Sequence, residues 1–152
     1  MRSFRILAAV VLFASGLASI AVAPALAADP LGTWLTEDQK AQIRIVNCGG
    51  ALCGTIVWLK EPIDPDTHQP KTDKNNPDAS KKGRPLLGVP IVLDMKPSGT
   101  PNKWDGQVYK ADEDSPGIYT GSFTMTGANT AELKGCVMGG LICKAQTWTR
   151  AN

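Results

Sequence analysis

The chain has 152 residues, with 16 basic and 14 acidic side chains and a formal net charge of +2. Two of the basic residues, Arg2 and Arg5, lie in an N-terminal segment that we expect to be removed, which leaves 14 side chains of each sign. A nucleic-acid-binding protein needs clustered Lys and Arg to displace phosphate counterions, so this balance argues against that class of partner.

Residues 1–27 have the pattern of a cleaved secretory signal. Arg2 and Arg5 precede an apolar run, and the small-x-small sequence "ALA" ends the segment at residue 27. An uncleaved membrane anchor is the weaker interpretation, because Ser15, Gly16 and Ser19 dilute the run. We therefore predict a periplasmic or secreted protein with no stable membrane insertion after cleavage, in which residues 28–152 form one domain.

The rest of the chain predicts an all-β fold. No window has a sustained helical period, and short segments rich in β-branched and aromatic residues alternate with turn sequences such as "PSGTPN" and "TGAN". An antiparallel eight-stranded barrel would satisfy this pattern and leave no edge strand. The expected strands are Thr33–Glu37, Ala41–Asn47, Gly54–Lys60, Val89–Asp94, Gly106–Ala111, Gly117–Thr126, Thr130–Val137 and Leu141–Arg150.

The first cysteine pair suggests a stapled hairpin. If Cys48 lies opposite Cys53 around the loop 49–52, apolar side chains gather on the inner face and the cysteines lie on the outer face. Ile45 would then face Ile56 and Ile43 would face Trp58. This register predicts Ile43, Ile45, Ile56 and Trp58 as residues that line the barrel.

Residues 61–85 form a long polar connection with five prolines and no apolar period. A connection of this length inside a compact domain is typically functional or mobile. We expect it either to cover the mouth of the barrel, where Asp73, Asn75 and Asn76 would contact a ligand, or to be a solvated link. Its acidic residues lack the spacing of an EF-hand, so we predict no metal.

The second cysteine pair predicts another stapled hairpin. With Cys136 opposite Cys143, the apolar residues again fall on one face. Two polar residues, Lys144 and Gln146, share that face with Leu133 and Trp148. We predict that these four residues line the barrel and contact a ligand.

Four cysteines in an exported chain allow three disulfide pairings. Their spacings, C-x4-C and C-x6-C, fit neither a typical zinc site nor a C-x-x-C redox centre. The hairpin registers favour the local pairs Cys48–Cys53 and Cys136–Cys143 over long-range pairs.

The two ends of the predicted barrel resemble the lipocalin and calycin signature. "GTW" at 32–34 opens the first strand and "TWTR" at 147–150 closes the last. The resemblance implies that Trp34 seals one end and that Arg150 caps its ring through a cation-π contact. The alternative to this resemblance is that Trp34 is an ordinary core residue and that Arg150 is a solvated residue at the end of the last strand.

The runs "GTWLTEDQKAQIRIVNCGGALCGTIVWLKEP", "DKNNPD", "GRPLLG" and "GCVMGGLICKAQTWTR" also resemble the small exported bacterial proteins of the domain of unknown function 2147. This resemblance implies an extracytoplasmic lipocalin-like barrel. It implies no reaction or ligand.

The predicted function is therefore to bind an unknown small amphipathic molecule in the barrel lumen, with no cofactor and no catalytic residues. A surface module that binds another protein of the cell envelope is the alternative. A hydrolase is disfavoured because His68, the one histidine, lies in the 61–85 connection and the sequence offers it no serine in a nucleophile elbow and no free thiol to activate. The sequence does not indicate an oligomeric state.

Overall fold

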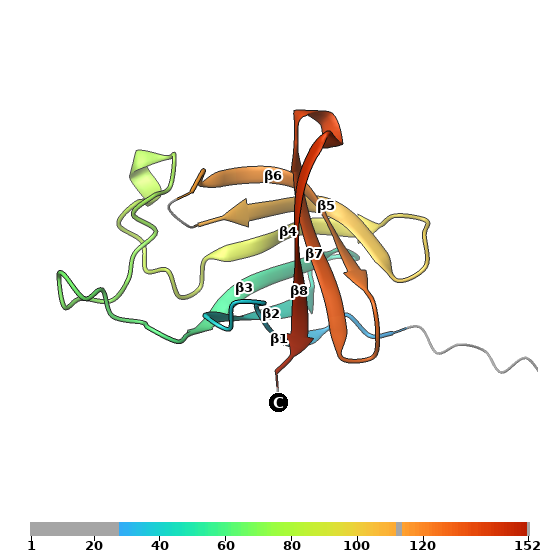
Figure 1. Ribbon diagram of the computed structural model, residues 1–152, viewed down its shortest axis with the longest axis horizontal. Coiled ribbons are helices and arrows are strands. Elements are labelled where there is room, and N and C mark those ends of the chain that lie inside the picture. Colours follow the sequence, from blue (N-terminus) through green and yellow to red (C-terminus); the bar gives the residue numbers. More distant parts are fainter. Residues whose placement is uncertain (1–27, 112–113, 152) are drawn as a thin grey trace, which may run out of the picture.

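The computed structural model describes residues 28–111 and 114–151, which contain a closed barrel of eight antiparallel strands in sequence order (Figure 1). The expected signal at 1–27 lies outside the described residues. Every strand pairs with its neighbours in the chain, and β1 closes the barrel on β8. The strands are β1 (Gly32–Leu35), β2 (Ala41–Asn47), β3 (Leu52–Leu59), β4 (Pro90–Pro97), β5 (Lys103–Lys110), β6 (Gly117–Met125), β7 (Thr130–Val137) and β8 (Ile142–Arg150).

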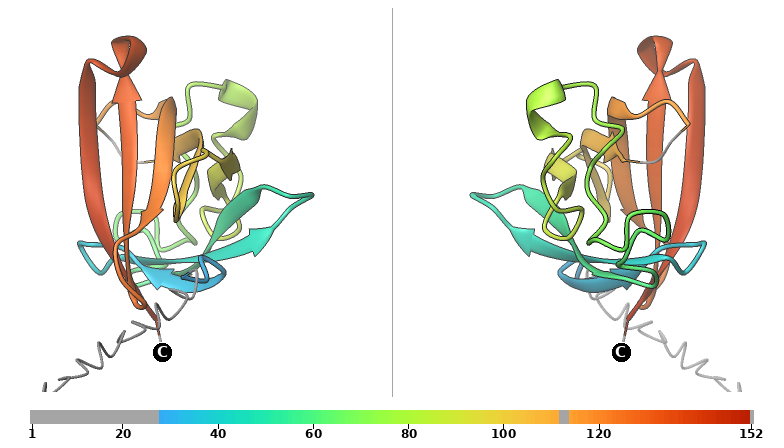
Figure 2. Two further views of the ribbon diagram at one scale, coloured as in Figure 1. Left: turned by 90° about the vertical axis from the view of Figure 1, so that its right-hand side faces the viewer. Right: turned by 90° about the vertical axis from the view of Figure 1, so that its left-hand side faces the viewer.

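This up-and-down order sorts the connections into two groups. Successive strands run in opposite directions, so the β1–β2, β3–β4, β5–β6 and β7–β8 connections lie at one end of the barrel. The β2–β3, β4–β5 and β6–β7 turns lie at the other end. In Figure 1 the long β3–β4 connection extends from the first of these ends, and in the right-hand view of Figure 2 it lies in front of the strands, with the short 3-10 helix Ala79–Lys81 within it.

Aromatic rings fill the centre of the barrel. Phe123 on β6 is fully buried and lies edge-on to Trp34 and Trp148, with ring centroids 5.6 and 6.2 Å away. Trp104 packs against the same ring at 6.3 Å. Such edge-on pairs are favourable because the positive edge of one ring meets the negative face of the next. This cluster occupies the part of the lumen next to Trp34.

Trp34 and Arg150 close that end of the barrel. The Arg150 guanidinium lies 4.4 Å from the centre of the buried Trp34 ring and donates to the backbone oxygens of Leu31 at 2.7 Å and Asp29 at 2.6 Å. Gly32 is required beneath it, because its φ is +126° and an added Cβ would lie 2.7 Å from Arg150 Nη1. The spacing Gly-x-Trp thus lets the arginine approach the indole.

We expect Arg150→Ala to lower the free energy of unfolding by about 2 kcal/mol, because it removes a cation-π contact and two charged hydrogen bonds. Denaturant midpoints measure this change. The control is Arg44→Ala, since Arg44 is exposed on β2 and should change stability by less than about 0.5 kcal/mol. Equal midpoints for the two variants would show that Arg150 does not stabilise the closed end.

Two disulfides staple hairpins at opposite ends of the barrel, with the pairings predicted from the sequence. Cys48 is joined to Cys53 at the β2–β3 turn, and Cys136 to Cys143 at the β7–β8 turn. In the second hairpin the cysteines face each other directly, with Cα atoms 4.1 Å apart.

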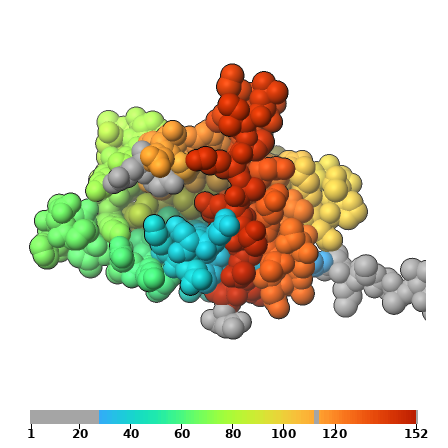
Figure 3. All heavy atoms as spheres, viewed as in Figure 1, coloured from blue at the N-terminus to red at the C-terminus, as the bar shows by residue number. Residues whose placement is uncertain are grey.

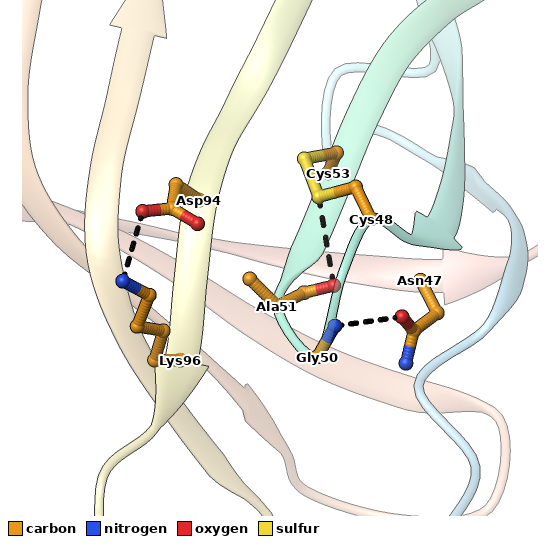
Figure 4. Close-up of a disulfide and its surroundings, with 7 residues drawn as sticks. All are labelled: Asn47, Cys48, Gly50, Ala51, Cys53, Asp94 and Lys96. Carbon is orange, nitrogen blue, oxygen red and sulfur yellow. Dashed lines mark hydrogen bonds and ion pairs between the residues drawn. A yellow bond between two sulfur atoms is a disulfide. The ribbon is translucent and has the colours of Figure 1, made fainter.

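The first hairpin differs from its predicted register. Cys53 lies opposite Val46, and the turn is confined to Gly49 and Gly50, whose φ values are +75° and +87° (Figure 4). Two consecutive glycines with positive φ favour a two-residue turn, whose twist matches the strands. The bridge is therefore diagonal, with the Cα atoms of Cys48 and Cys53 5.9 Å apart.

A bulge in β3 changes the face of Trp58. Ile43 lies opposite Ile56, whereas the preceding residue Gln42 lies opposite Trp58, so Val57 is an extra residue in β3. An extra residue reverses the alternation of side chains beyond it. Trp58 is 41% exposed, and its prediction as a residue of the lumen is wrong.

Candidate functional site

A cavity of about 430 Å³ occupies the barrel between the aromatic cluster and the open end. Side chains from β2 to β8 reach it, and Figure 3 shows the surface hollowed between the turn 36–40 and β8. Its volume falls within the range of small-molecule pockets. The lining residues are Thr36, Asp38, Lys40, Ala41, Ile43, Ile56, Ile91, Val108, Tyr109, Lys110, Ala111, Asp114, Ser115, Tyr119, Leu133, Gly135, Val137, Ile142, Lys144, Gln146 and Trp148.

The depth of this cavity is apolar and its mouth is polar. Ile43, Ile56, Leu133 and Trp148 are buried on the walls. Asp38 and Lys40 come from the β1–β2 connection and Asp114 from the β5–β6 connection, while Lys110 is the last residue of β5 and Lys144 lies on β8. Apolar walls with a few polar groups at one side suit a molecule that has an apolar part and a polar head.

Six predicted lumen residues lie on this cavity: Ile43, Ile56, Leu133, Lys144, Gln146 and Trp148. Gln146 Oε1 accepts a hydrogen bond of 3.2 Å from the Trp148 indole, which holds both side chains on the wall. Ile45 is buried but packs in the core and does not line the cavity. Its register partner is Gly54 near the closed end, instead of Ile56 as expected.

The acidic residue Asp73 organises the β3–β4 connection. Its side chain is fully buried and accepts hydrogen bonds from Tyr109 Oη at 2.7 Å, Asn76 Nδ2 at 2.8 Å and Arg84 Nε at 2.9 Å. Arg84 Nη2 also lies 2.8 Å from the Asp73 carboxylate, so the guanidinium contacts it through two nitrogens. Because Tyr109 belongs to β5, this cluster attaches the connection to the barrel wall.

Asp73 and Asn76, which were predicted as ligand contacts, line neither cavity of the barrel end, and their contact with a ligand stays a prediction. Both side chains are buried and use their polar atoms within the Tyr109–Arg84 cluster. Asn75 lies on a second cavity, described below. The connection is neither a simple solvated link nor a loose cover, because it is bound to β5 through buried polar groups.

The same cluster changes the ionisation of Tyr109. Burial, together with the hydrogen bond to Asp73 and the negative charge of that residue, raises the pKa of the Tyr109 phenol to about 12. The phenol therefore remains a hydrogen-bond donor to Asp73 at neutral pH. It lines the barrel cavity as a neutral group.

Several cavity residues have no distinctive sequence pattern. Tyr109, Gly135, Tyr119 and Ala111 line the cavity, and Arg84 orients Asp73. Arg84 lies in the quoted "GRPLLG" run, but its partners are known only when the chain is folded. Alternation along β5 and β7 would have been the only sequence signal for Tyr109 and Gly135.

His68 is exposed, lies in a turn with a φ of +57°, and does not line either cavity. Within residues 28–111 and 114–151, no three His, Cys, Asp or Glu side chains are grouped as metal ligands. No helix in the same residues has the length and apolar character needed to cross a membrane.

The closed eight-stranded barrel with its Trp34–Arg150 end is lipocalin-like. A solved structure described as "Protein HP1028 from the human pathogen Helicobacter pylori belongs to the lipocalin family" has a similar fold, with a TM-score of 0.65 and 19% identity. The match covers 82% of this chain and 84% of that one.

The chain belongs to the family described as "Uncharacterized protein conserved in bacteria (DUF2147)", whose model matches residues 32–150. That match includes all eight strands and both disulfides. No curated protein sequence matches the chain significantly.

Proposed function

We propose that this protein binds a small amphipathic molecule in the barrel cavity and does not catalyse a reaction. The observation that carries the proposal is the open cavity of about 430 Å³ with apolar walls and a polar mouth. Burial of apolar ligand surface would supply affinity of about 25 cal/mol per Å². Gln146 and Lys144 would orient the ligand within the barrel cavity.

A periplasmic or secreted location is part of the same proposal. Two disulfides support it, because such bonds persist in oxidising compartments and are rare in the cytosol. Native mass spectrometry of the protein purified from its own periplasm would test both points, since it detects the removal of residues 1–27 and any retained small molecule.

Filling the cavity tests the binding site directly. Gly135 lines the cavity, and a Cβ added there would meet only Tyr119 Cβ at 3.7 Å, an ordinary contact. We expect Gly135→Leu to weaken binding of the neutral fluorescent probe N-phenyl-1-naphthylamine by about tenfold or more, with the unfolding midpoint nearly unchanged. Fluorescence titration and thermal melting measure the two quantities.

Gly83→Leu is the matched control, because Gly83 lies in the β3–β4 connection with open space around its Cβ position. It should bind the probe like the native protein. Trp58→Ala is a second control, since Trp58 lies outside the cavity. If Gly135→Leu folds normally and binds the probe unchanged, the barrel cavity is not the binding site.

The β7–β8 turn favours the second candidate function, a module that binds another envelope protein. Met138, Leu141 and Ile142 are 69%, 82% and 56% exposed at a stapled tip that projects from the barrel (Figure 1). Exposed apolar side chains gathered in one place are typical of interaction sites. Retained partner binding by Gly135→Leu and its loss in Leu141→Ser would favour this alternative.

A further inference from the structure

A second cavity, also of about 430 Å³, lies between the β3–β4 connection and the open end of the barrel. It adjoins the barrel cavity, because the two share Lys40, Ala41, Ile56 and Ala111 as lining residues. We call it the outer chamber. Its other lining residues are Leu59 at the end of β3 and side chains of the β3–β4 connection.

The walls of the outer chamber are preformed by the Asp73 cluster. Thr72 pairs with Pro85, and Asp73 N donates to Arg84 O at 3.0 Å. Leu86 N donates to Lys71 O at 2.9 Å, so the two arms of the connection are joined beside the chamber. Because Asp73 also binds Tyr109 on β5, these arms are held against the barrel.

The chamber has more positive than negative side chains. Four lysines line it, against the two carboxylates of Glu61 and Asp64. Each carboxylate pairs with one lysine: Lys71 Nζ is 3.5 Å from Glu61, and Lys74 Nζ is 3.4 Å from Asp64. The remaining cations are Lys40 and Lys60.

The Asp64 carboxylate is held by groups other than Lys40 and Lys60. It accepts hydrogen bonds from the backbone N–H groups of Thr67 at 3.1 Å and Asp66 at 3.0 Å. These bonds, followed by the interaction with Lys74, lower the pKa of Asp64 and keep it anionic within its own turn. The Asp64 carboxylate therefore interacts with the backbone of its own turn and with Lys74.

Lys40 and Lys60 lie together where the two cavities meet. Lys60 N donates to Lys40 O at 2.8 Å, which fixes the two residues side by side. Lys40 Nζ is 4.0 Å from Asp38, but both side chains are more than half exposed, so this pair contributes little. Among the described residues, no carboxylate lies within ion-pair distance of Lys60 Nζ.

We propose that the outer chamber receives the anionic head group of the ligand, a carboxylate or a phosphate, whose apolar part occupies the barrel cavity. Lys40 and Lys60 bind this head group through charge-assisted hydrogen bonds. The inference rests on the proposed binding function and specifies its ligand class. The junction residues Ala41, Ile56 and Ala111 provide the apolar passage between the two chambers.

Three probes that share a twelve-carbon chain and differ in the head group test this site: dodecanoate, dodecyl phosphate and dodecan-1-ol. Binding to the purified protein is followed by calorimetry and by intrinsic tryptophan fluorescence, to which Trp148 on the wall of the barrel cavity contributes. We expect at least one of the two anions to bind about tenfold or more tightly than the alcohol at low salt. The advantage should shrink as salt increases. The preferred anion identifies the head group as carboxylate or phosphate.

The variant Lys40→Gln/Lys60→Gln should abolish this advantage, so that the variant binds the two anions no more tightly than it binds dodecan-1-ol. The matched control is Lys81→Gln/Lys82→Gln. It removes two exposed lysines of the β3–β4 connection, and neither of them lines a cavity. It should retain the preference for the anion.

The outcomes separate the two proposals. If all three probes bind equally, or if the anion preference survives Lys40→Gln/Lys60→Gln, the head-group site is wrong while binding in the barrel stands. If the native protein binds none of the three, the barrel function is contradicted and the head-group inference falls with it.

Discussion

Asp73→Ala is expected to lower the free energy of unfolding by about 3 kcal/mol, the largest stability effect of any substitution considered for this chain. The change removes a fully buried carboxylate and leaves Tyr109, Asn76 and Arg84 without their shared partner. Breaking a buried ion pair by removing one member costs about 3 to 5 kcal/mol, and we take the lower value because the Arg84 side chain is 32% exposed and can be hydrated.

Urea denaturation of the native protein and the variant measures this loss. The control is Asp66→Ala, which removes an exposed carboxylate from the same connection and should change stability by less than about 0.5 kcal/mol. Hydrogen exchange should also become faster across residues 70–86 in Asp73→Ala. A variant that retains native stability and native exchange would show that the connection does not depend on this cluster.

The second large effect is a loss of stability at alkaline pH that depends on Tyr109. Its pKa is raised in the folded state to about 12, compared with 10.0 for an ordinary tyrosine. The stabilisation is therefore fully present below pH 10 and is lost as the pH rises through 12. A difference of two pKa units corresponds to about 2.7 kcal/mol in total, of which about 1.4 kcal/mol is lost by pH 11.

Tyr109→Phe isolates this contribution, because the two proteins differ in no other titratable side chain. The stability difference between the native protein and Tyr109→Phe should narrow by about 1.4 kcal/mol between pH 8 and pH 11. Short denaturant titrations at each pH measure it. A difference that stays constant over this range would mean that burial and Asp73 do not raise the pKa of the Tyr109 phenol in the folded protein.

Local sequence was sufficient for the strands and for the second hairpin. All eight expected strands are present, with ends that differ by a few residues. Alternation between polar and apolar residues depends on neighbours along one strand, and turn residues act within a few positions. For the same reason, placing Cys136 opposite Cys143 correctly put Leu133, Gln146 and Trp148 on one face.

The first hairpin shows where local reasoning failed. A four-residue loop and the two-residue turn at Gly49 and Gly50 both allow a bridge from Cys48 to Cys53, so the disulfide did not determine the register. The bulge at Val57 then moved Trp58 to the outside. Nothing in the alternation of β3 marks this extra residue, since its position depends on packing between strands.

The sequence by itself determined the class of this protein: a disulfide-stapled barrel with a glycine, a tryptophan and an arginine placed to close one end. Tertiary structure alone decided the chemistry of the open end. Asp73 meets Tyr109 across 36 positions of the chain, and Lys40 meets Lys60 across a strand pair. Such contacts form because the connections of an up-and-down barrel meet at one end. The residues involved are far apart in the chain, so local sequence patterns do not predict which of them come into contact.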